Sequence, residues 1–142
     1  MTEQHKGDGV ARAMLQPINT AAIIILGVFT IVWGIWVGNP LWSLFDHAAL
    51  YHVMDFLPEY FWGGIAFACG VGMTFGVLHN SYNSLRISSI IGFYHWTMIT
   101  LLFFAGDWQS TGGITAATIA VYCGFIYLNL RVNRKILSFN RS

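Results

Sequence analysis

Charged residues are scarce in this chain of 142 residues. Asp, Glu, Lys and Arg make up 9% of it and apolar residues 56%, whereas soluble domains carry about 25% charged residues. Seven Lys and Arg against six Asp and Glu leave a formal net charge of +1. This balance excludes a basic nucleic-acid-binding surface and an acidic tail, so we expect no nucleic-acid partner.

Residues and motifs that carry familiar chemistry are scarce as well. The two cysteines, Cys69 and Cys123, are too few for a disulfide framework or a cysteine-rich zinc site. The chain contains no G-x-S-x-G motif, no P-loop, no H-E-x-x-H motif and no C-x-x-C motif. These absences predict a protein that is not an enzyme and that binds no cofactor or metal.

Long apolar runs are what the chain has instead. Four runs lack Asp, Glu, Lys and Arg altogether: 18–37, 60–78, 87–105 and 112–130. At 1.5 Å per residue each would form a helix of about 28–30 Å, which matches the hydrocarbon core of a bilayer. We therefore predict an all-α, polytopic membrane protein with four transmembrane helices in one bundle over 18–130. Because no carboxylate lies in a span, an ion- or proton-coupled transporter is not favoured.

The cations fall on one side of these spans. They lie before the first span, between the second and third, and after the fourth: Lys6, Arg12, Arg86, Arg131, Arg134, Lys135 and Arg141. The positive-inside rule then places the polar N-terminus, 1–17, and the cationic tail, 131–142, in the cytoplasm. We expect Arg131, Arg134 and Lys135 of the tail to attract anionic lipids of the bilayer.

The long outer connection, 38–59, predicts an additional amphipathic helix. Asn39-Pro40 is typical of a helix start, and Pro58 would end the helix. Such a helix lies on the outer surface of the membrane that the bundle spans, or folds back over the bundle. Its aromatic, acidic and histidine side chains are the candidates for contact with a partner: Trp42, Asp46, His47, His52 and Asp55.

Small residues spaced four apart mark helix contacts in the second and fourth spans. They share a helix face and let backbones approach closely: Ala68, Gly72, Gly76, Ala116, Ala120 and Gly124. Gly72 and Gly76 form a G-x-x-x-G motif. These faces either close the bundle within one chain or join subunits of a homo-oligomer or of a larger membrane complex.

His95 is an ionisable residue near the middle of the third span. Such a group must find a partner in the membrane or stay neutral, and Tyr94, Thr97 and Thr100 are candidate partners. We expect a structural histidine, with a proton or pore site as the alternative. A haem held by two histidines would need His79 and His95 at similar depth, whereas they differ by about half the membrane.

Several motifs flank the spans. They are Asn39-Pro40, Pro58-Glu59-Tyr60-Phe61-Trp62-Gly63, the short turn that ends in Arg86, and Ser110-Thr111-Gly112-Gly113-Ile114-Thr115 before a span that ends Tyr127-Leu128-Asn129-Leu130-Arg131. With these motifs the chain from Val32 to Lys135 resembles small four-span membrane proteins of tailed bacteriophages and prophages. The resemblance implies a phage-derived inner-membrane protein of holin-like type, although familiar holins have two or three spans.

Three functions are compatible with these features. The first is a holin-like protein, which oligomerises through its small-residue faces and permeabilises the inner membrane. The second is a structural, accessory or superinfection-exclusion protein that binds a partner through the outer loop. The third is a haem or electron-transfer membrane subunit.

The distribution of cations predicts the topology. Alkaline phosphatase fused within 38–59 should be active in a bacterial host, because this connection is expected outside the cytoplasm. Green fluorescent protein fused after residue 142 should be fluorescent, because both termini are expected in the cytoplasm. Phosphatase activity of a fusion at residue 142 would contradict this orientation.

Overall fold

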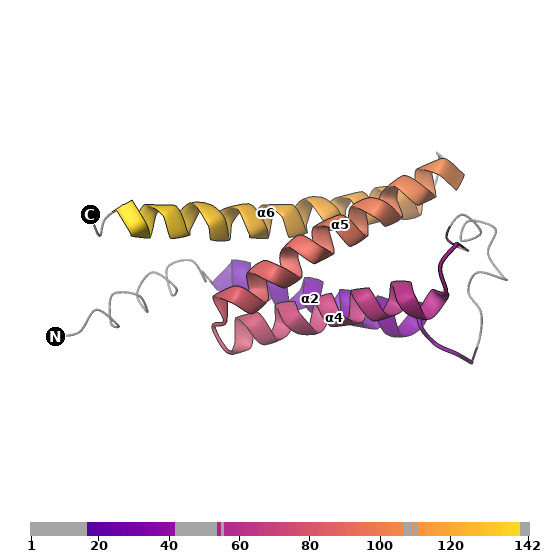
Figure 1. Ribbon diagram of the computed structural model, residues 1–142, viewed down its shortest axis with the longest axis horizontal. Coiled ribbons are helices and arrows are strands. Elements are labelled where there is room, and N and C mark those ends of the chain that lie inside the picture. The colour runs from indigo at the N-terminus through magenta and orange to yellow at the C-terminus, as the bar shows by residue number, and fades with distance from the viewer. Residues whose placement is uncertain (1–16, 42–53, 55, 107–108, 110, 140–142) are drawn as a thin grey trace.

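Helices make up nearly all of the part of the chain that the structure describes. The computed structural model describes residues 17–41, 54, 56–106, 109 and 111–139. Its helices over these residues are α2 (Pro17–Val37), α4 (Glu59–Leu78), α5 (Tyr82–Gly106) and α6 (Thr111–Phe139) (Figure 1). Each is long and apolar enough to cross a membrane. The predicted all-helical fold with four candidate spans is thus confirmed.

The helices extend beyond the charge-free runs that predicted them. α5 begins at Tyr82 and includes Arg86, and α6 continues past Arg131 to Phe139. An absence of charge marks where a helix can lie in lipid, whereas the backbone can remain helical through charged residues outside it. The amphipathic helix expected in 38–59 falls mostly on 42–53, which lie outside the described residues.

The turn between α4 and α5 is held by backbone hydrogen bonds. The amide of Ser81 donates to the carbonyl of Gly76 at 2.8 Å, and that of Asn80 donates to Val77 at 3.3 Å. This pattern is a Schellman motif, in which the residue after the helix adopts the left-handed conformation. Asn80 does so with φ 50°, and Asn tolerates this region better than most residues. The chain therefore reverses within three residues.

α2 and α4 lie against each other through glycines spaced seven residues apart. Gly34 faces Gly63, and Gly27 faces Gly70. An ideal Cβ on Gly63 would lie 2.5 Å from the carbonyl oxygen of Gly34, and one on Gly70 would lie 2.5 Å from that of Gly27. Any larger side chain would therefore force the backbones apart. We call this contact the glycine seam.

The contact between α4 and α5 changes in side-chain size along its length. Near the turn the side chains in this contact are small. A Cβ on Gly76 would lie 2.8 Å from the amide of Leu85, and the hydroxyl of Ser84 donates to the carbonyl of Gly72 at 2.9 Å. At the other end the buried side chains are large and include Trp62, Trp96, Ile99 and Phe103. Because bulky residues hold the backbones apart, α5 diverges from α4 (Figure 1).

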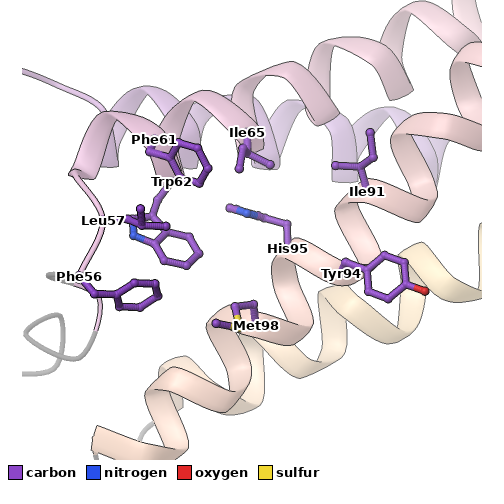
Figure 2. A pocket seen from close by; sticks show the side chains of 9 residues that line it. All are labelled: Phe56, Leu57, Phe61, Trp62, Ile65, Ile91, Tyr94, His95 and Met98. Atoms are coloured by element: carbon purple, nitrogen blue, oxygen red, sulfur yellow. The ribbon is translucent and has the colours of Figure 1, made fainter.

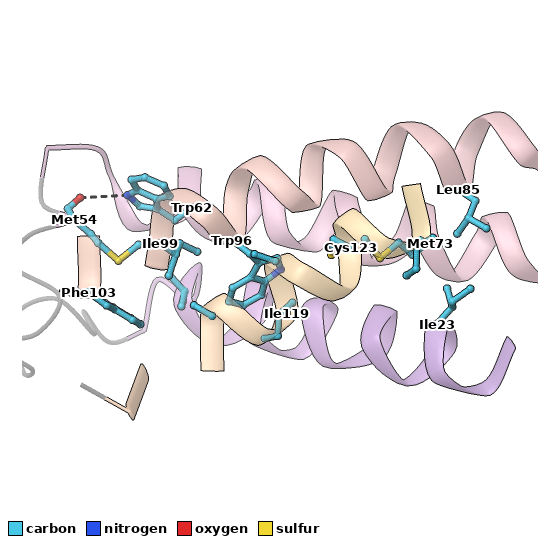
Figure 3. Packing of buried hydrophobic residues seen from close by; sticks show 14 of the residues in the cluster. Ile23, Met54, Trp62, Met73, Leu85, Trp96, Ile99, Phe103, Ile119 and Cys123 are labelled. Atoms are coloured by element: carbon cyan, nitrogen blue, oxygen red, sulfur yellow. Dashed lines mark hydrogen bonds between the residues drawn. The ribbon is translucent and has the colours of Figure 1, made fainter. Parts of the chain in front are cut away.

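α5 and α6 form a second closely packed pair. A Cβ on Gly124 would lie 3.1 Å from the ring of Phe93, and one on Gly113 would lie 3.0 Å from that of Phe104. Near the turn end, the hydroxyl of Tyr82 donates to the carbonyl of Leu130 at 3.3 Å. The bundle thus consists of two helix pairs, α2–α4 and α5–α6, around a shared core (Figure 3).

One residue of the connection before α4 belongs to that core. Met54 is fully buried, and the indole Nε1 of Trp62 donates to its carbonyl at 3.2 Å (Figure 3). The amide of Leu57 donates to the same carbonyl at 3.3 Å. These bonds fix the end of the connection against the start of α4.

Large apolar side chains cover the outside of every helix. Exposed examples are Ile25 and Val32 on α2, Phe67 and Val71 on α4, Leu101 on α5, and Val121 and Phe125 on α6. A soluble monomer rarely exposes so much contiguous apolar surface. The surface is therefore suited to contact with lipid chains.

The glycine seam predicts opposite outcomes at two neighbouring glycines. Gly63→Ala should lower the free energy of unfolding by about 1–3 kcal/mol, because its Cβ meets backbone atoms of α2. Gly64→Ala is the matched control, since a Cβ there meets nothing within 4 Å. Unfolding in mixed micelles with increasing dodecyl sulfate measures both. Equal stability of the two variants would show that α2 does not approach α4 at Gly63.

Candidate functional site

A groove opens on the side of the bundle where α4 and α5 diverge (Figure 2). It has a volume of about 430 Å³, which falls within the range of small-molecule sites, about 300–1,000 Å³. We call it the lateral groove. Its lining residues are Phe56, Leu57, Phe61, Trp62, Ile65, Ile91, Tyr94, His95 and Met98.

The mouth of the lateral groove faces outward from the bundle. Tyr94, Ile91, Phe61 and Met98 line the groove and are each partly exposed, Tyr94 by 66%. No charged residue is among the lining residues. In a membrane the groove would therefore open toward lipid rather than toward water.

His95 is the most buried polar residue of the groove. Its side chain is 6% exposed and extends from α5 toward α4 (Figure 2). The indole rings of Trp33 and Trp62 each lie 6.0 Å from the imidazole, between ring centroids. Trp33 also lies 4.9 Å from Trp96. An aromatic cluster from α2, α4 and α5 thus surrounds the histidine.

The Nε2 atom of His95 has no hydrogen-bond partner among the described residues. The hydroxyls expected to bond it are engaged elsewhere: Thr97 donates to the carbonyl of Phe93 and Thr100 to that of Trp96, both at 2.7 Å. The structure therefore does not bring these expected partners to the imidazole. A buried polar atom left without a partner costs about 1–3 kcal/mol.

Trp96 carries a second orphaned group. Its Nε1 is buried and likewise has no hydrogen-bond partner within the described part of the chain. It is not among the lining residues of the lateral groove. Two consecutive residues of α5 thus hold ring nitrogens without a partner among the described residues, and of the two only His95 lines the lateral groove.

The small residues singled out in the second span contact α5 of the same chain. A Cβ on Gly72 would meet the hydroxyl of Ser88, and one on Gly76 would meet the backbone of Leu85. Ala68, by contrast, is exposed. The G-x-x-x-G motif is therefore occupied within the bundle.

The small residues of the fourth span are buried or lie against α5. Ala116 and Ala120 are 2% and 5% exposed, and Gly124 lies against the ring of Phe93. The glycine seam between α2 and α4 was not predicted. Its residues are seven apart, so a search for small residues four apart does not find them.

Among the described residues, His79 and the two cysteines do not form a shared site with His95. His79 lies at the end of α4, where it stacks on Phe75 with 4.1 Å between ring centroids. His95 lies about 20 Å along α5 from Tyr82, at 1.5 Å per residue, so the two histidines do not meet. Cys69 and Cys123 are buried and free. The described residues hold no group of three or more His, Cys, Asp or Glu side chains placed to share a metal.

Other predicted residues lie partly beyond the described structure. The candidates for partner contact, Trp42, Asp46, His47, His52 and Asp55, are outside the described residues. Arg131 is exposed on α6. Arg134 and Lys135 lie on the helical backbone of α6.

The unpartnered imidazole makes a testable prediction about stability. His95→Leu should leave the free energy of unfolding unchanged or raise it by up to about 1–3 kcal/mol, because an apolar side chain has no unmet hydrogen bond. Ile99→Ala, at a fully buried position one turn on, should lower it by about 2–5 kcal/mol. A clear loss of stability in His95→Leu, measured in mixed micelles, would mean that the imidazole has a partner in the folded protein.

Comparison of this chain with protein-family models, curated proteins and solved structures found no match.

Proposed function

We propose that this protein is a holin-like integral membrane protein, which assembles into homo-oligomers in a bacterial inner membrane and permeabilises it. It acts without catalysis and with both termini in the cytoplasm. Support comes from the four apolar spans, from the resemblance to phage membrane proteins, and above all from the division of the bundle into two helix pairs.

The contacts within each helix pair differ from the contacts between the two pairs. Within the α2–α4 pair the backbones approach at Gly63 and Gly70, and within the α5–α6 pair Gly113 and Gly124 lie against rings of α5. Between the pairs, close backbone approach is found near the turn, at Gly76 and Leu85. The pairs can therefore part at their far ends without breaking their internal contacts, and neighbouring copies can replace the lost contacts.

α6 carries the polar side chains that suit a water-facing helix. Thr111, Thr115 and Thr118 are exposed on it. The hydroxyl of Thr115 donates to the carbonyl of Thr111 at 3.0 Å, and that of Thr118 to Ile114 at 2.9 Å. These bonds satisfy the hydroxyl protons in lipid, while the oxygen lone pairs stay available to water. We assign α6 to the lining of the opening that the oligomer forms in the membrane, which we call the lesion.

Induced expression in a bacterial host tests this function directly. Culture density and membrane potential are followed together, with and without a co-expressed endolysin. Sudden loss of potential at a reproducible time, with lysis only when the endolysin is present, is the expected result. Continued growth with an intact potential would contradict it and would favour an accessory or superinfection-exclusion protein that binds a partner through 38–59.

The threonines of α6 supply the matched variants. The double change Thr115→Val and Thr118→Val should delay the loss of potential, because it removes hydroxyls from the helix assigned to the lesion. Thr97→Val with Thr100→Val is the control, since those hydroxyls are half-buried on α5 and also bond their own helix. Equal delays in both double variants, at equal protein levels, would exclude α6 from the lining.

A further inference from the structure

We propose that the lateral groove binds the head group of an isoprenoid quinone, with Nε2 of His95 as its hydrogen-bond partner. The isoprenoid tail would leave through the mouth of the groove into the bilayer. This site is independent of permeabilisation, so either proposal can fail without the other.

The histidine supplies the polar end of the site. His95 is 6% exposed and lines the groove. Its Nε2 lacks a hydrogen-bond partner among the described residues. A neutral imidazole has one donor and one acceptor nitrogen. It can therefore donate to a quinone carbonyl or accept from a quinol hydroxyl.

The walls favour a flat, conjugated ring. Phe61 and Trp62 come from α4 and Tyr94 from α5, and all three line the groove (Figure 2). The indole of Trp62 lies 6.0 Å from the imidazole of His95, between ring centroids. Aromatic side chains stack on planar rings with centroids about 4.5–7 Å apart. A saturated lipid chain would fill the same space without using the imidazole.

Charge and depth narrow the ligand further. No Lys, Arg, Asp or Glu lines the groove, so a phosphate or carboxylate head group would be left without a counter-ion. His95 lies near the middle of α5, far from either end of that apolar helix. A neutral, lipid-soluble molecule with one hydrogen-bonding ring is the ligand that meets both conditions.

Entry of a ligand requires side chains at the mouth of the groove to move. Nε2 is shielded from water in this structure, and the side chains of Met98 and Phe61 stand partly exposed beside it. Met has three flexible side-chain bonds and adapts its shape readily. In this proposal, a ring entering from lipid displaces these side chains to reach the imidazole.

Quenching of tryptophan fluorescence can test binding, because Trp33 and Trp62 lie beside His95. The full-length protein in phosphatidylcholine nanodiscs is titrated with ubiquinone that carries a single isoprenoid unit. We expect saturable quenching, with affinity about tenfold weaker or more in His95→Leu because one hydrogen bond is lost. His79→Leu, the same change outside the groove, should bind like the unaltered protein.

A second pair of variants leaves the imidazole in place. Ile91→Trp should fill the mouth of the groove and weaken binding by a similar factor, whereas Val121→Trp, on the exposed side of α6, should not. Circular dichroism and gel filtration establish that each variant is folded. The hydrocarbon phytane, which has an isoprenoid skeleton without a head group, should not displace the quinone.

Three results would overturn the proposal. They are quenching that does not saturate, equal affinity in His95→Leu and His79→Leu, and recovery of the tryptophan fluorescence when phytane is added. The last result would identify the groove as a site for lipid chains alone.

Discussion

Close approach of α2 to α4 at the glycine seam is the constraint on which the rest of the bundle depends. In lipid, apolar side chains gain little by leaving their surroundings, so helices associate through van der Waals contact and hydrogen bonds. Gly34 against Gly63 and Gly27 against Gly70 maximise that contact. Their spacing of seven residues keeps both contacts on one side of each helix, as in a left-handed coil. The two helices thereby form one closely packed pair, against which α5 packs.

Side-chain size then decides how α5 lies on that pair. Glycine and serine at Gly72, Gly76 and Ser88 bring α5 close beside the turn, and Trp62 and Phe103 hold it away at the other end. The resulting angle produces the lateral groove without any break in a helix. The same angle leaves His95 between the diverging helices, where its own helix offers no free partner.

The coarse fold could be predicted because it depends on one property, the absence of charge over a length that spans a bilayer. The hydrogen-bonding surroundings of His95 were harder to predict. Thr97 and Thr100 were close in sequence, but each hydroxyl bonds the carbonyl four residues earlier in the same helix. The glycine seam and the lateral groove depend on which faces of two helices meet. No single run of residues contains that information, and a motif such as Gly72 to Gly76 does not specify its partner helix.

The indole of Trp62, which donates a hydrogen bond to the carbonyl of Met54, takes part in two regions of the structure. Its Nε1 holds the connection that precedes α4, and its ring forms a wall beside His95. A pull on that connection would therefore be transmitted to the groove as a rotation or shift of the same side chain. The binding of a ring in the groove would, in turn, stiffen the attachment of the connection. Phe56 and Leu57 of the connection also line the groove, so a change in the position of the connection changes the freedom of the groove, and the reverse.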